Sequence, residues 1–210
     1  MTRIVIADDH AIVRKGLRQI ISAVPDLTVT GEAGTADELL TLLRSRPFDL
    51  VILDLSLGMR SGLELLKQIK SEFPQMPVLI LSMHAEELYA VRAFRAGASG
   101  YVQKESAPDE LVQAIQRIAT GGTYVSVRMA SALAAEVSQR KPQMMPHERL
   151  SDRELEVFRL LGTGHSVSEI AKALNLSVKT VSTHRSRIVE KTGLKTNAAI
   201  VHYVLANALG

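Results

Sequence analysis

The sequence predicts an α/β fold with a doubly wound parallel sheet of five strands, followed by a small all-α helix-turn-helix domain. Five short runs rich in Val, Ile and Leu, typical of strands buried on both faces, alternate with helical patterns over residues 1–122. Each helical pattern ends at a proline or glycine. From Ser151 onward the pattern is helical throughout. Alternating β and α units favour a parallel sheet with helices on both faces.

The predicted strands are residues 4–7, 27–30, 50–53, 78–81 and 101–102. The predicted helices between and after them are residues 11–23, 36–46, 62–72, 86–96 and 108–120. Prolines follow the first three helices, and glycines follow the last two. Proline disfavours helical backbone in the residue before it, and glycine commonly ends a helix, so these residues set the boundaries.

The second half of the chain divides into a linker and a basic domain. We predict a first domain over residues 1–122, a linker over 123–147 with a possible short helix near 129–137, and a second domain over 148–210. Residues 139–149 contain two prolines and no apolar period, as expected of a linker. Residues 1–124 carry a net charge of −2, whereas residues 147–210 carry +3. The asymmetry indicates a division of labour.

Composition excludes several classes of site. The 210 residues include no cysteine, which excludes disulfides, thiol catalysis and cysteine-based zinc sites. The six histidines are scattered and show no metal-ligand spacing. No apolar run approaches the roughly 20 residues that a membrane helix needs. We therefore expect a cytoplasmic protein without membrane segments.

Polar residues follow four of the predicted strands where those strands end. Asp8 and Asp9 follow the first strand, Asp54 the third and Ser82 the fourth, and Lys104 lies just past the fifth. In a doubly wound sheet these strand ends are neighbours, so the side chains converge in one cleft. Three carboxylates there suit Mg²⁺, which would relieve their mutual repulsion. Each residue alone has a plainer interpretation as a helix cap or a solvated charge, and their coincidence favours a site.

These residues give the first domain its resemblance to a known family. Residues 1–122 resemble the flavodoxin-like receiver domain of bacterial two-component response regulators. The resemblance is carried by Asp8, Asp9, residues 51–57, Ser61, Gly62, Leu81, Ser82 and Lys104.

The resemblance implies a role for each residue of the cluster. Asp54 would accept a phosphoryl group from a sensor histidine kinase and would contribute to the Mg²⁺ site. Asp9 would bind Mg²⁺ directly, Asp8 mainly through water, and Ser56 through its backbone carbonyl. Ser82 and Lys104 would contact the phosphoryl oxygens. Tyr101 would be the switch aromatic that turns inward.

Two positions depart from the family pattern. Gly58 stands four residues after Asp54, where the family usually has proline, so a freer loop is expected there. Glu105 follows Lys104 where proline with a cis bond is frequent. A non-proline cis bond costs about 3 kcal/mol, so we expect a trans bond.

The basic end of the chain contains three helix-start signals. Ser151 with Glu154 forms a capping box, and Ser166 with Glu169 repeats it. Ser177 caps the next helix. Apolar positions predict a short buried helix from Val167, Ile170, Ala171 and Leu174, and a second helix that buries Val178, Val181 and Ile188. Two such helices joined by a tight turn indicate a helix-turn-helix.

The second of these helices carries a polar outer face. A helix-turn-helix places that face in the major groove of double-stranded DNA, where basic residues meet phosphates and hydroxyls meet base edges. The plainer alternative is a solvated helix surface. The predicted DNA-binding residues are Lys179, Ser182, Thr183, His184, Arg185, Ser186, Arg187 and Lys191.

A second resemblance covers this domain. Residues 148–209 resemble the LuxR-type output domain, on residues that include Ser151, Arg153, Glu154, Gly164, Glu169, Ile170, Ala171, Ser177, Lys179, Thr180, Val181, His184 and Lys191. The resemblance implies that the final helix, near residues 197–209, makes a homodimer contact. Its apolar stripe of Ile200, Val201, Val204 and Leu205 is equally compatible with an internal core.

Together the two domains predict a response regulator of the NarL/FixJ type, not an enzyme. Phosphorylation of Asp54 would then control dimerisation and DNA binding. One alternative is a DNA-binding regulator that acts without phosphorylation and uses its first domain for protein interactions. Another is a Mg²⁺-dependent phosphohydrolase with an aspartyl nucleophile, which the adjacent aspartates on the first strand disfavour because such enzymes have an Asp-x-Asp pattern there.

Overall fold

The chain forms two compact units, Met1–Ser138 and Gln139–Gly210. The structure is a computed structural model that describes residues 1–57, 61–83, 86–106, 108–126, 130, 145–207 and 209. Most of the predicted linker, including nearly all of the possible helix near 129–137, lies outside these residues. No helix in the described part of the chain is both long and apolar enough to cross a bilayer.

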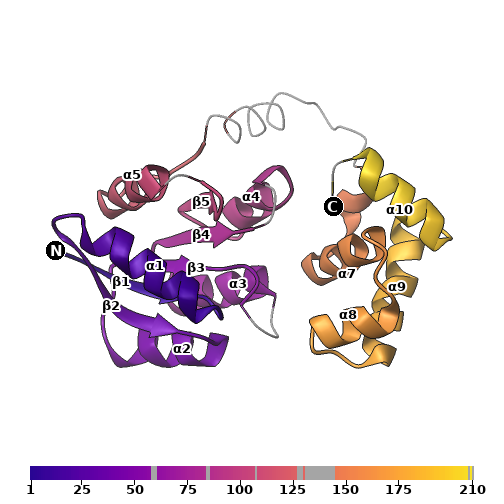
Figure 1. The fold of residues 1–210 in the computed structure, drawn as a ribbon, viewed down its shortest axis with the longest axis horizontal. Coiled ribbons are helices and arrows are strands. Elements are labelled where there is room, and N and C mark those ends of the chain that lie inside the picture. The colour runs from indigo at the N-terminus through magenta and orange to yellow at the C-terminus, as the bar shows by residue number, and fades with distance from the viewer. Residues whose placement is uncertain are drawn as a thin grey trace. The chain divides into compact units, whose positions relative to one another are not determined.

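The first unit is a five-stranded parallel sheet with helices on both faces (Figure 1). The strands are β1 (Thr2–Ala7), β2 (Leu27–Ala33), β3 (Leu50–Leu53), β4 (Val78–Ser82) and β5 (Gly100–Gln103). Their order is β2-β1-β3-β4-β5, which confirms the doubly wound prediction. The strand ends that carry the acidic cluster are therefore neighbours, because Ala7 pairs with Leu53 and Ser82 pairs with Gln103.

Four of the five strands are longer than the sequence pattern predicts. β1 begins two residues earlier, at Thr2, and β4 ends one residue later, at Ser82. β2 continues to Ala33, through a small Gly31 and a charged Glu32 that do not look like strand residues. β2 is an edge strand, so only alternate residues at its end are buried, and a polar residue is tolerated there. β5 extends one residue beyond the prediction at each end.

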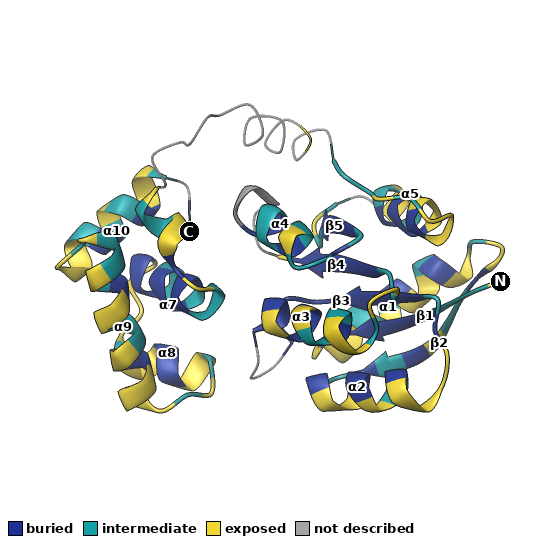
Figure 2. Ribbon diagram, turned by 180° about the vertical axis from the view of Figure 1, so that it is seen from behind, coloured by how far each residue is buried: buried dark blue, intermediate teal, exposed yellow. Residues whose placement is uncertain are grey.

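Five helices connect and cover these strands. They are α1 (Ala11–Ser22), α2 (Ala36–Ser45), α3 (Gly62–Glu72), α4 (Glu86–Arg95) and α5 (Pro108–Ala119). α1 and α5 cover one face, where Leu17, Ile21 and Ile115 pack against Ile4 and Ile52 of the sheet. Strands β3 and β4 are buried throughout, while the outer sides of the helices are exposed (Figure 2). This core holds the strand ends at fixed positions.

The start of α3 lies against the chain that follows β3. The Gly62 N–H donates to the carbonyl of Leu55 over 3.1 Å. A Cβ atom at Gly62 would lie 2.5 Å from that carbonyl oxygen, so only glycine fits. Because Leu55 directly follows Asp54, this close approach helps to fix the backbone beside the acidic cluster.

The second unit is helical. It contains the 3-10 turn η1 (Pro146–Arg149) and helices α7 (Asp152–Gly162), α8 (Val167–Ala173), α9 (Val178–Thr192) and α10 (Asn197–Ala206). The predicted caps are present, since the hydroxyls of Ser151, Ser166 and Ser177 each accept an N–H three residues on. α9 ends at Gly193, whose φ of 74° is a conformation that favours glycine.

Two sequence-based expectations for the second unit need correction. Val178 is 51% exposed instead of buried, because it lies in the first turn of α9, outside the packed stripe of Val181 and Ile188. α10 ends at Ala206, earlier than the predicted 209. Its apolar residues face two ways, since Ile200 and Val204 are buried within the unit while Leu205 is 72% exposed.

A buried carboxylate links α7 to α9. Glu154 is 2% exposed, and its carboxylate accepts the Ser151 N–H over 2.8 Å and contacts the Lys191 ammonium at 2.5 Å. Burial alone would raise the pKa of Glu154, but the hydrogen bonds and the charge of Lys191 outweigh burial and lower the pKa below its usual value. The carboxylate is therefore held in its charged form.

We expect Gly62→Ala to lower the free energy of unfolding of the first unit by about 1–3 kcal/mol, because the methyl group overlaps the Leu55 backbone. Gly16→Ala is the matched control, since Gly16 also lies in a helix of this unit and a Cβ there meets nothing within 4 Å. That control should stabilise the unit by about 0.5–1 kcal/mol. Urea unfolding measures both changes, and equal effects would contradict the close packing at Gly62.

We expect Glu154→Gln to destabilise the second unit by about 1–2 kcal/mol at pH 7, discounted because Lys191 is partly exposed. A lowered folded-state pKa stabilises the fold above the unfolded-state value near 4.5, and the contribution is lost as the pH falls through the folded-state value. The difference between the two proteins should therefore shrink below about pH 4.5. Hydrogen exchange in residues 152–206 measures it, and a difference independent of pH would refute the ion pair's role.

Candidate functional site

Two buried carboxylates meet at the carboxyl ends of neighbouring strands. Asp8 follows β1 and is 1% exposed, and Asp54 follows β3 and is 2% exposed. The next residue along from Asp8, Asp9, is exposed. Two of the three predicted carboxylates are therefore buried, where an uncompensated negative charge costs folding free energy.

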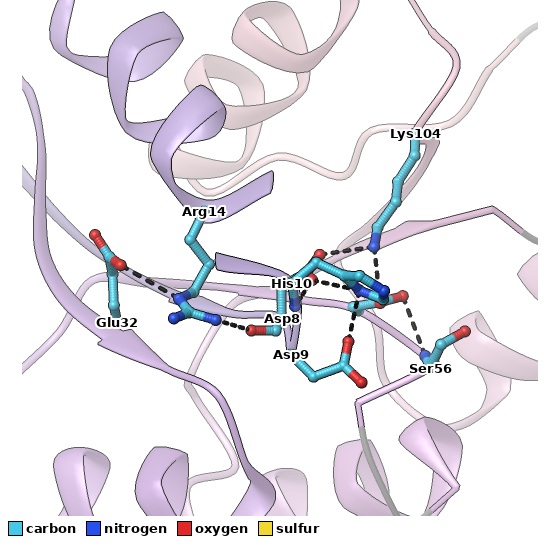
Figure 3. Close-up of polar contacts among 8 residues, drawn as sticks. Asp8, Asp9, His10, Arg14, Glu32, Ser56 and Lys104 are labelled. Atoms are coloured by element: carbon cyan, nitrogen blue, oxygen red, sulfur yellow. Dashed lines mark hydrogen bonds and ion pairs between the residues drawn. The ribbon is translucent and has the colours of Figure 1, made fainter. Parts of the chain in front are cut away.

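Lys104 supplies the compensating charge (Figure 3). Its ammonium nitrogen lies 2.6 Å from an Asp8 carboxylate oxygen and 2.8 Å from an Asp54 carboxylate oxygen. The backbone N–H of Lys104 donates to the carbonyl of Ser82 over 3.0 Å, which fixes the start of the side chain beyond β5. One lysine just past β5 thus bridges the carboxylates that follow β1 and β3.

Asp54 and Lys104 both have a raised pKa, but for different reasons. Burial raises the pKa of Asp54, and the hydrogen bonds from Lys104 and from the Ser56 N–H oppose this without cancelling it. Burial alone would lower the pKa of Lys104, but its hydrogen bonds to Asp54 and Asp8 raise the pKa above the usual value. Lys104 therefore stays charged, and Asp54 is a more basic carboxylate than an exposed aspartate.

Arg14 stabilises the turn between β1 and α1. Its guanidinium donates to the backbone carbonyl of Asp8 over 2.6 Å and to the Glu32 carboxylate over 3.3 Å (Figure 3). Arg14 thereby ties the acidic turn to the edge strand β2. Sequence reasoning missed this residue, because a lone arginine in an amphipathic helix gives no signal of a contact to a distant strand.

His10 is a second residue that sequence reasoning missed. Its Nδ1 lies 2.7 Å from an Asp9 carboxylate oxygen and 3.3 Å from Asp8. The spacing of the histidines gave no metal-ligand signal, but the ligand atom of His10 and those of Asp8, Asp9 and Asp54 all lie within 4.8 Å of one another. Adjacency to two aspartates was the signal that could have found it.

These donors fit a divalent cation. Carboxylate oxygens from Asp8, Asp9 and Asp54 converge within one coordination-sized space, and hard oxygen ligands suit Mg²⁺. Ser56, predicted to contribute its carbonyl, is exposed and donates its N–H to Asp54 over 3.1 Å. Gly58, two residues further on, lies outside the described residues.

The remaining predicted residues lie on the last two strands. Ser82 ends β4 and is fully buried, and Tyr101 in β5 is also buried. Tyr101 pairs with Ile80, two residues before Ser82 on the neighbouring strand. The Lys104–Glu105 peptide bond is trans, as expected. Asp8, Asp54 and Lys104 are thus in direct contact, while Ser82 reaches Lys104 through its backbone carbonyl.

The outer face of α9 presents five of the eight predicted DNA-binding residues. Lys179, Ser182, Thr183, Ser186 and Arg187 are all exposed. The three hydroxyls donate to backbone carbonyls four residues earlier, at 2.9, 3.0 and 3.1 Å. A hydroxyl that donates in this way keeps its lone pairs, so it faces outward as an acceptor.

The other three predicted DNA-binding residues are partly buried. Arg185 donates to the side-chain oxygen of Asn197 at the start of α10, over 3.0 and 3.2 Å. Lys191 pairs with the buried Glu154 of α7. His184 is half-buried. These contacts give Arg185 and Lys191 a role in holding α9 against its neighbours that the helical pattern did not reveal.

Two families match the two units. Residues 4–116 match the family described as "Response regulator receiver domain". Residues 148–204 match "Bacterial regulatory proteins, luxR family". The two matches leave the predicted linker between them.

Curated relatives match over nearly the whole chain. Response regulator UvrY of Escherichia coli strain K12 is 30% identical over 209 residues, covering 100% of this chain and 96% of the relative. Oxygen regulatory protein NreC of Staphylococcus carnosus is 35% identical over 213 residues, covering 99% and 98%. Each of these relatives therefore aligns across both units of this chain.

Solved structures agree with this assignment. RcsB from Salmonella enterica serovar Typhimurium, bound to promoter rprA in the presence of the phosphomimetic BeF3⁻, is 30% identical with a TM-score of 0.68, covering 96% of this chain and 97% of RcsB. A LuxR-family two-component response regulator from Aurantimonas sp. SI85-9A1 is 40% identical with a TM-score of 0.62, covering 66% and 99%. The chain therefore belongs to the two-component response regulators of the NarL/FixJ type, with a receiver domain followed by a LuxR-type DNA-binding domain.

Proposed function

We propose that Asp54 is the phosphoacceptor of this regulator and that its phosphorylation controls DNA binding by α9. The observation that carries the proposal is the buried Asp54 carboxylate, which lies in contact with Lys104 and beside two further aspartates. A carboxylate oxygen of Asp54 attacks phosphorus of a phosphohistidine on a sensor kinase. The new O–P bond forms as the P–N bond breaks, and the electron pair leaves with the imidazole nitrogen.

The proposed metal site uses the same carboxylates. Asp9 and Asp54 would bind Mg²⁺ directly, with Asp8 through water and Ser56 through its carbonyl. The ion supplies positive charge opposite the phosphoryl oxygens when it is bound. The support for this site is the convergence of donors within 4.8 Å. Asp54 can then serve as nucleophile while Asp8 and Asp9 keep the ion beside it.

Lys104 and Ser82 would respond to the phosphoryl group. The new oxygens attract the Lys104 ammonium, which lies 2.8 Å from Asp54 before the reaction. The Ser82 hydroxyl donates to another oxygen, and Tyr101 on the neighbouring strand follows that movement. Shifting a two-state equilibrium from 1% to 99% takes about 5.5 kcal/mol. Two or three charge-assisted hydrogen bonds of about 1.5–3 kcal/mol each supply that energy.

The second domain would read DNA as a homodimer. α9 enters the major groove, with Lys179 and Arg187 on phosphates and the exposed hydroxyls accepting from base amino groups. The exposed Leu205 of α10, together with Val201 on the same helix, is a suitable dimer contact. The DNA-bound RcsB structures, including one described as two RcsB dimers bound to two parallel DNAs, support this arrangement. Because DNA is the proposed partner, we place the chain in the cytoplasm.

We keep the domain boundaries that the sequence predicts. We assign residues 1–122 to the receiver, 123–147 to the linker and 148–210 to the output domain. A regulator that ignores phosphorylation has no use for a compensated cluster of buried carboxylates, which costs stability to maintain. We propose no substrate turnover, because a phosphohydrolase with an aspartyl nucleophile would have an Asp-x-Asp pattern after the first strand, where this chain has two adjacent aspartates.

Asp54→Asn should abolish labelling of the intact protein by a small acyl phosphate donor in the presence of Mg²⁺, because the amide cannot form the acyl phosphate. Mass spectrometry of the whole chain detects the added phosphoryl group. Asp109→Asn, which changes an exposed aspartate at the start of α5, is the control and should be labelled normally. Labelling of the Asp54→Asn protein would refute the assignment.

Lys179→Ala and Arg187→Ala should each weaken binding to random-sequence duplex DNA and reduce the slope of log K against log salt by about 1. Lys15→Ala, which removes an exposed lysine from α1 in the receiver, is the control for net charge. Fluorescence anisotropy at several salt concentrations gives the slopes, before and after treatment with the phosphodonor. An unchanged slope in both α9 variants would contradict the proposed surface, and affinity unaffected by the phosphodonor would favour the regulator that acts without phosphorylation.

A further inference from the structure

Both polar groups of the Asp8 backbone are tied to the edge strand β2. The Asp8 N–H donates to the Ala33 carbonyl over 3.1 Å. The Asp8 carbonyl accepts the Arg14 guanidinium over 2.6 Å, and the same guanidinium donates to the Glu32 carboxylate over 3.3 Å (Figure 3). The N–H is therefore held by β2 directly, and the carbonyl is held through the Arg14–Glu32 pair.

A residue skipped in β2 turns Glu32 toward α1. The pairing of β2 with β1 passes from Val29 directly to Gly31 and leaves out Thr30. Side chains alternate between the two faces of a strand, so a separation of three residues would normally put Val29 and Glu32 on opposite faces. The extra residue returns Glu32 to the face of Val29, which packs in the core that α1 and α5 cover. The irregularity thus aims a carboxylate at α1 beside the acidic cluster.

Arg14 reaches both of its partners from the start of α1. Its backbone N–H donates to the His10 carbonyl over 3.2 Å, so Arg14 lies one turn into the helix. Long side chains on a helix point back toward the N-terminus, which carries the guanidinium to the Asp8 carbonyl. The Arg14 side chain is only 19% exposed. Its planar fork donates in two directions at once, and the single ammonium of a lysine does not reproduce that geometry.

The direction of the Asp8 carbonyl affects the residue that follows it. A peptide group is planar, so the Asp8 carbonyl and the Asp9 N–H turn together, and they set the path of the chain into Asp9. Asp9 is exposed, so packing around it contributes little to its position. The Arg14 contact therefore helps to determine where the Asp9 carboxylate lies relative to Asp54.

We propose that Arg14 is a positioning residue for the metal site, and that Glu32 acts through Arg14. The inference rests on the proposed function, because it concerns the placement of Asp9 as a ligand of Mg²⁺. Arginine offers no acceptor atom, so Arg14 contributes no ligand of its own. Residues that orient metal ligands in this way commonly contribute about 10–100-fold to metal affinity.

Calorimetric titration of the unphosphorylated full-length chain with Mg²⁺ tests the inference without any phosphoryl transfer. Arg14→Met keeps a long side chain but removes the donor fork, and we expect it to weaken Mg²⁺ binding about tenfold or more. Arg18→Met is the matched control. Arg18 pairs with the same Glu32 carboxylate from the next turn of α1, and its recorded hydrogen bonds go to Glu32 and not to the Asp8 backbone. The control should bind Mg²⁺ like the unaltered chain.

Two milder variants separate position from charge and from folding. Arg14→Lys keeps the positive charge without the fork, so we expect a Mg²⁺ affinity between those of Arg14→Met and the unaltered chain. Glu32→Gln keeps Arg14 and removes the charge that anchors it, so we expect a smaller loss than in Arg14→Met. Glu32→Gln decides the question if Arg14→Met does not fold.

The rate at which a small acyl phosphate labels Asp54 gives a second readout. We expect Arg14→Met to raise the Mg²⁺ concentration of half-maximal rate by the same factor as the dissociation constant. The rate at saturating Mg²⁺ should stay close to that of the unaltered chain. A purely structural role of Arg14 would lower the melting temperature and leave the Mg²⁺ dependence of the folded protein unchanged.

Unchanged Mg²⁺ affinity in a folded Arg14→Met chain would overturn the inference, as would an equal loss in Arg18→Met or full recovery in Arg14→Lys. Unchanged affinity in Glu32→Gln would overturn the role given to Glu32. In each of these cases the unaltered chain still binds Mg²⁺ and is labelled at Asp54, so the proposed function stands. An unaltered chain that neither binds Mg²⁺ nor is labelled would instead contradict the proposed function itself.

Discussion

The receiver depends on one lysine placed between two buried carboxylates. Asp8 and Asp54 lie at the ends of neighbouring strands, almost entirely out of water, and the Lys104 ammonium contacts both. Without a cation, two buried carboxylates repel each other and lose their hydration. The positive charge of Lys104 explains how acidic residues can stand at the end of an apolar strand. It also makes the site sensitive to any charge added at Asp54, because one ammonium group cannot satisfy every oxygen equally.

In the proposed function, the sheet order turns that local charge balance into a conformational signal. β1, β3, β4 and β5 are consecutive neighbours. In the proposed function, a phosphoryl group on Asp54, just past β3, acts on Lys104, which Asp54 contacts directly, and on Ser82 at the end of β4. Lys104 already hydrogen-bonds through its backbone to the Ser82 carbonyl. The output unit has a separate core, held by the Glu154–Lys191 pair and by the packing of α10 on Gly162. In the proposed function, phosphorylation changes the exposed surface of the receiver, and that change controls DNA binding.

Much of this arrangement could be predicted from the sequence, for identifiable reasons. Proline and glycine mark the helix ends, and short apolar runs mark the strands, so the fold follows from local patterns. Convergence of Asp8, Asp54 and Lys104 follows from topology, since parallel strands end at one edge. Contacts of Arg14, Lys191 and Arg185 could not be predicted, because each is made by one long side chain whose partner is not indicated by helical periodicity. Val178 was misplaced because helical periodicity does not distinguish a first turn from the packed stripe.

The central claim is that Lys104 is the internal counter-ion that moves to the phosphoryl group. A crystal structure of the receiver with BeF3⁻ and Mg²⁺ tests it most directly, through the position of the Lys104 nitrogen. The account predicts a BeF3⁻ group on Asp54, contacted by Lys104, with the 2.6 Å contact to Asp8 lost. A structure in which Lys104 keeps both of its present ion pairs, or in which BeF3⁻ is attached elsewhere, would contradict the account.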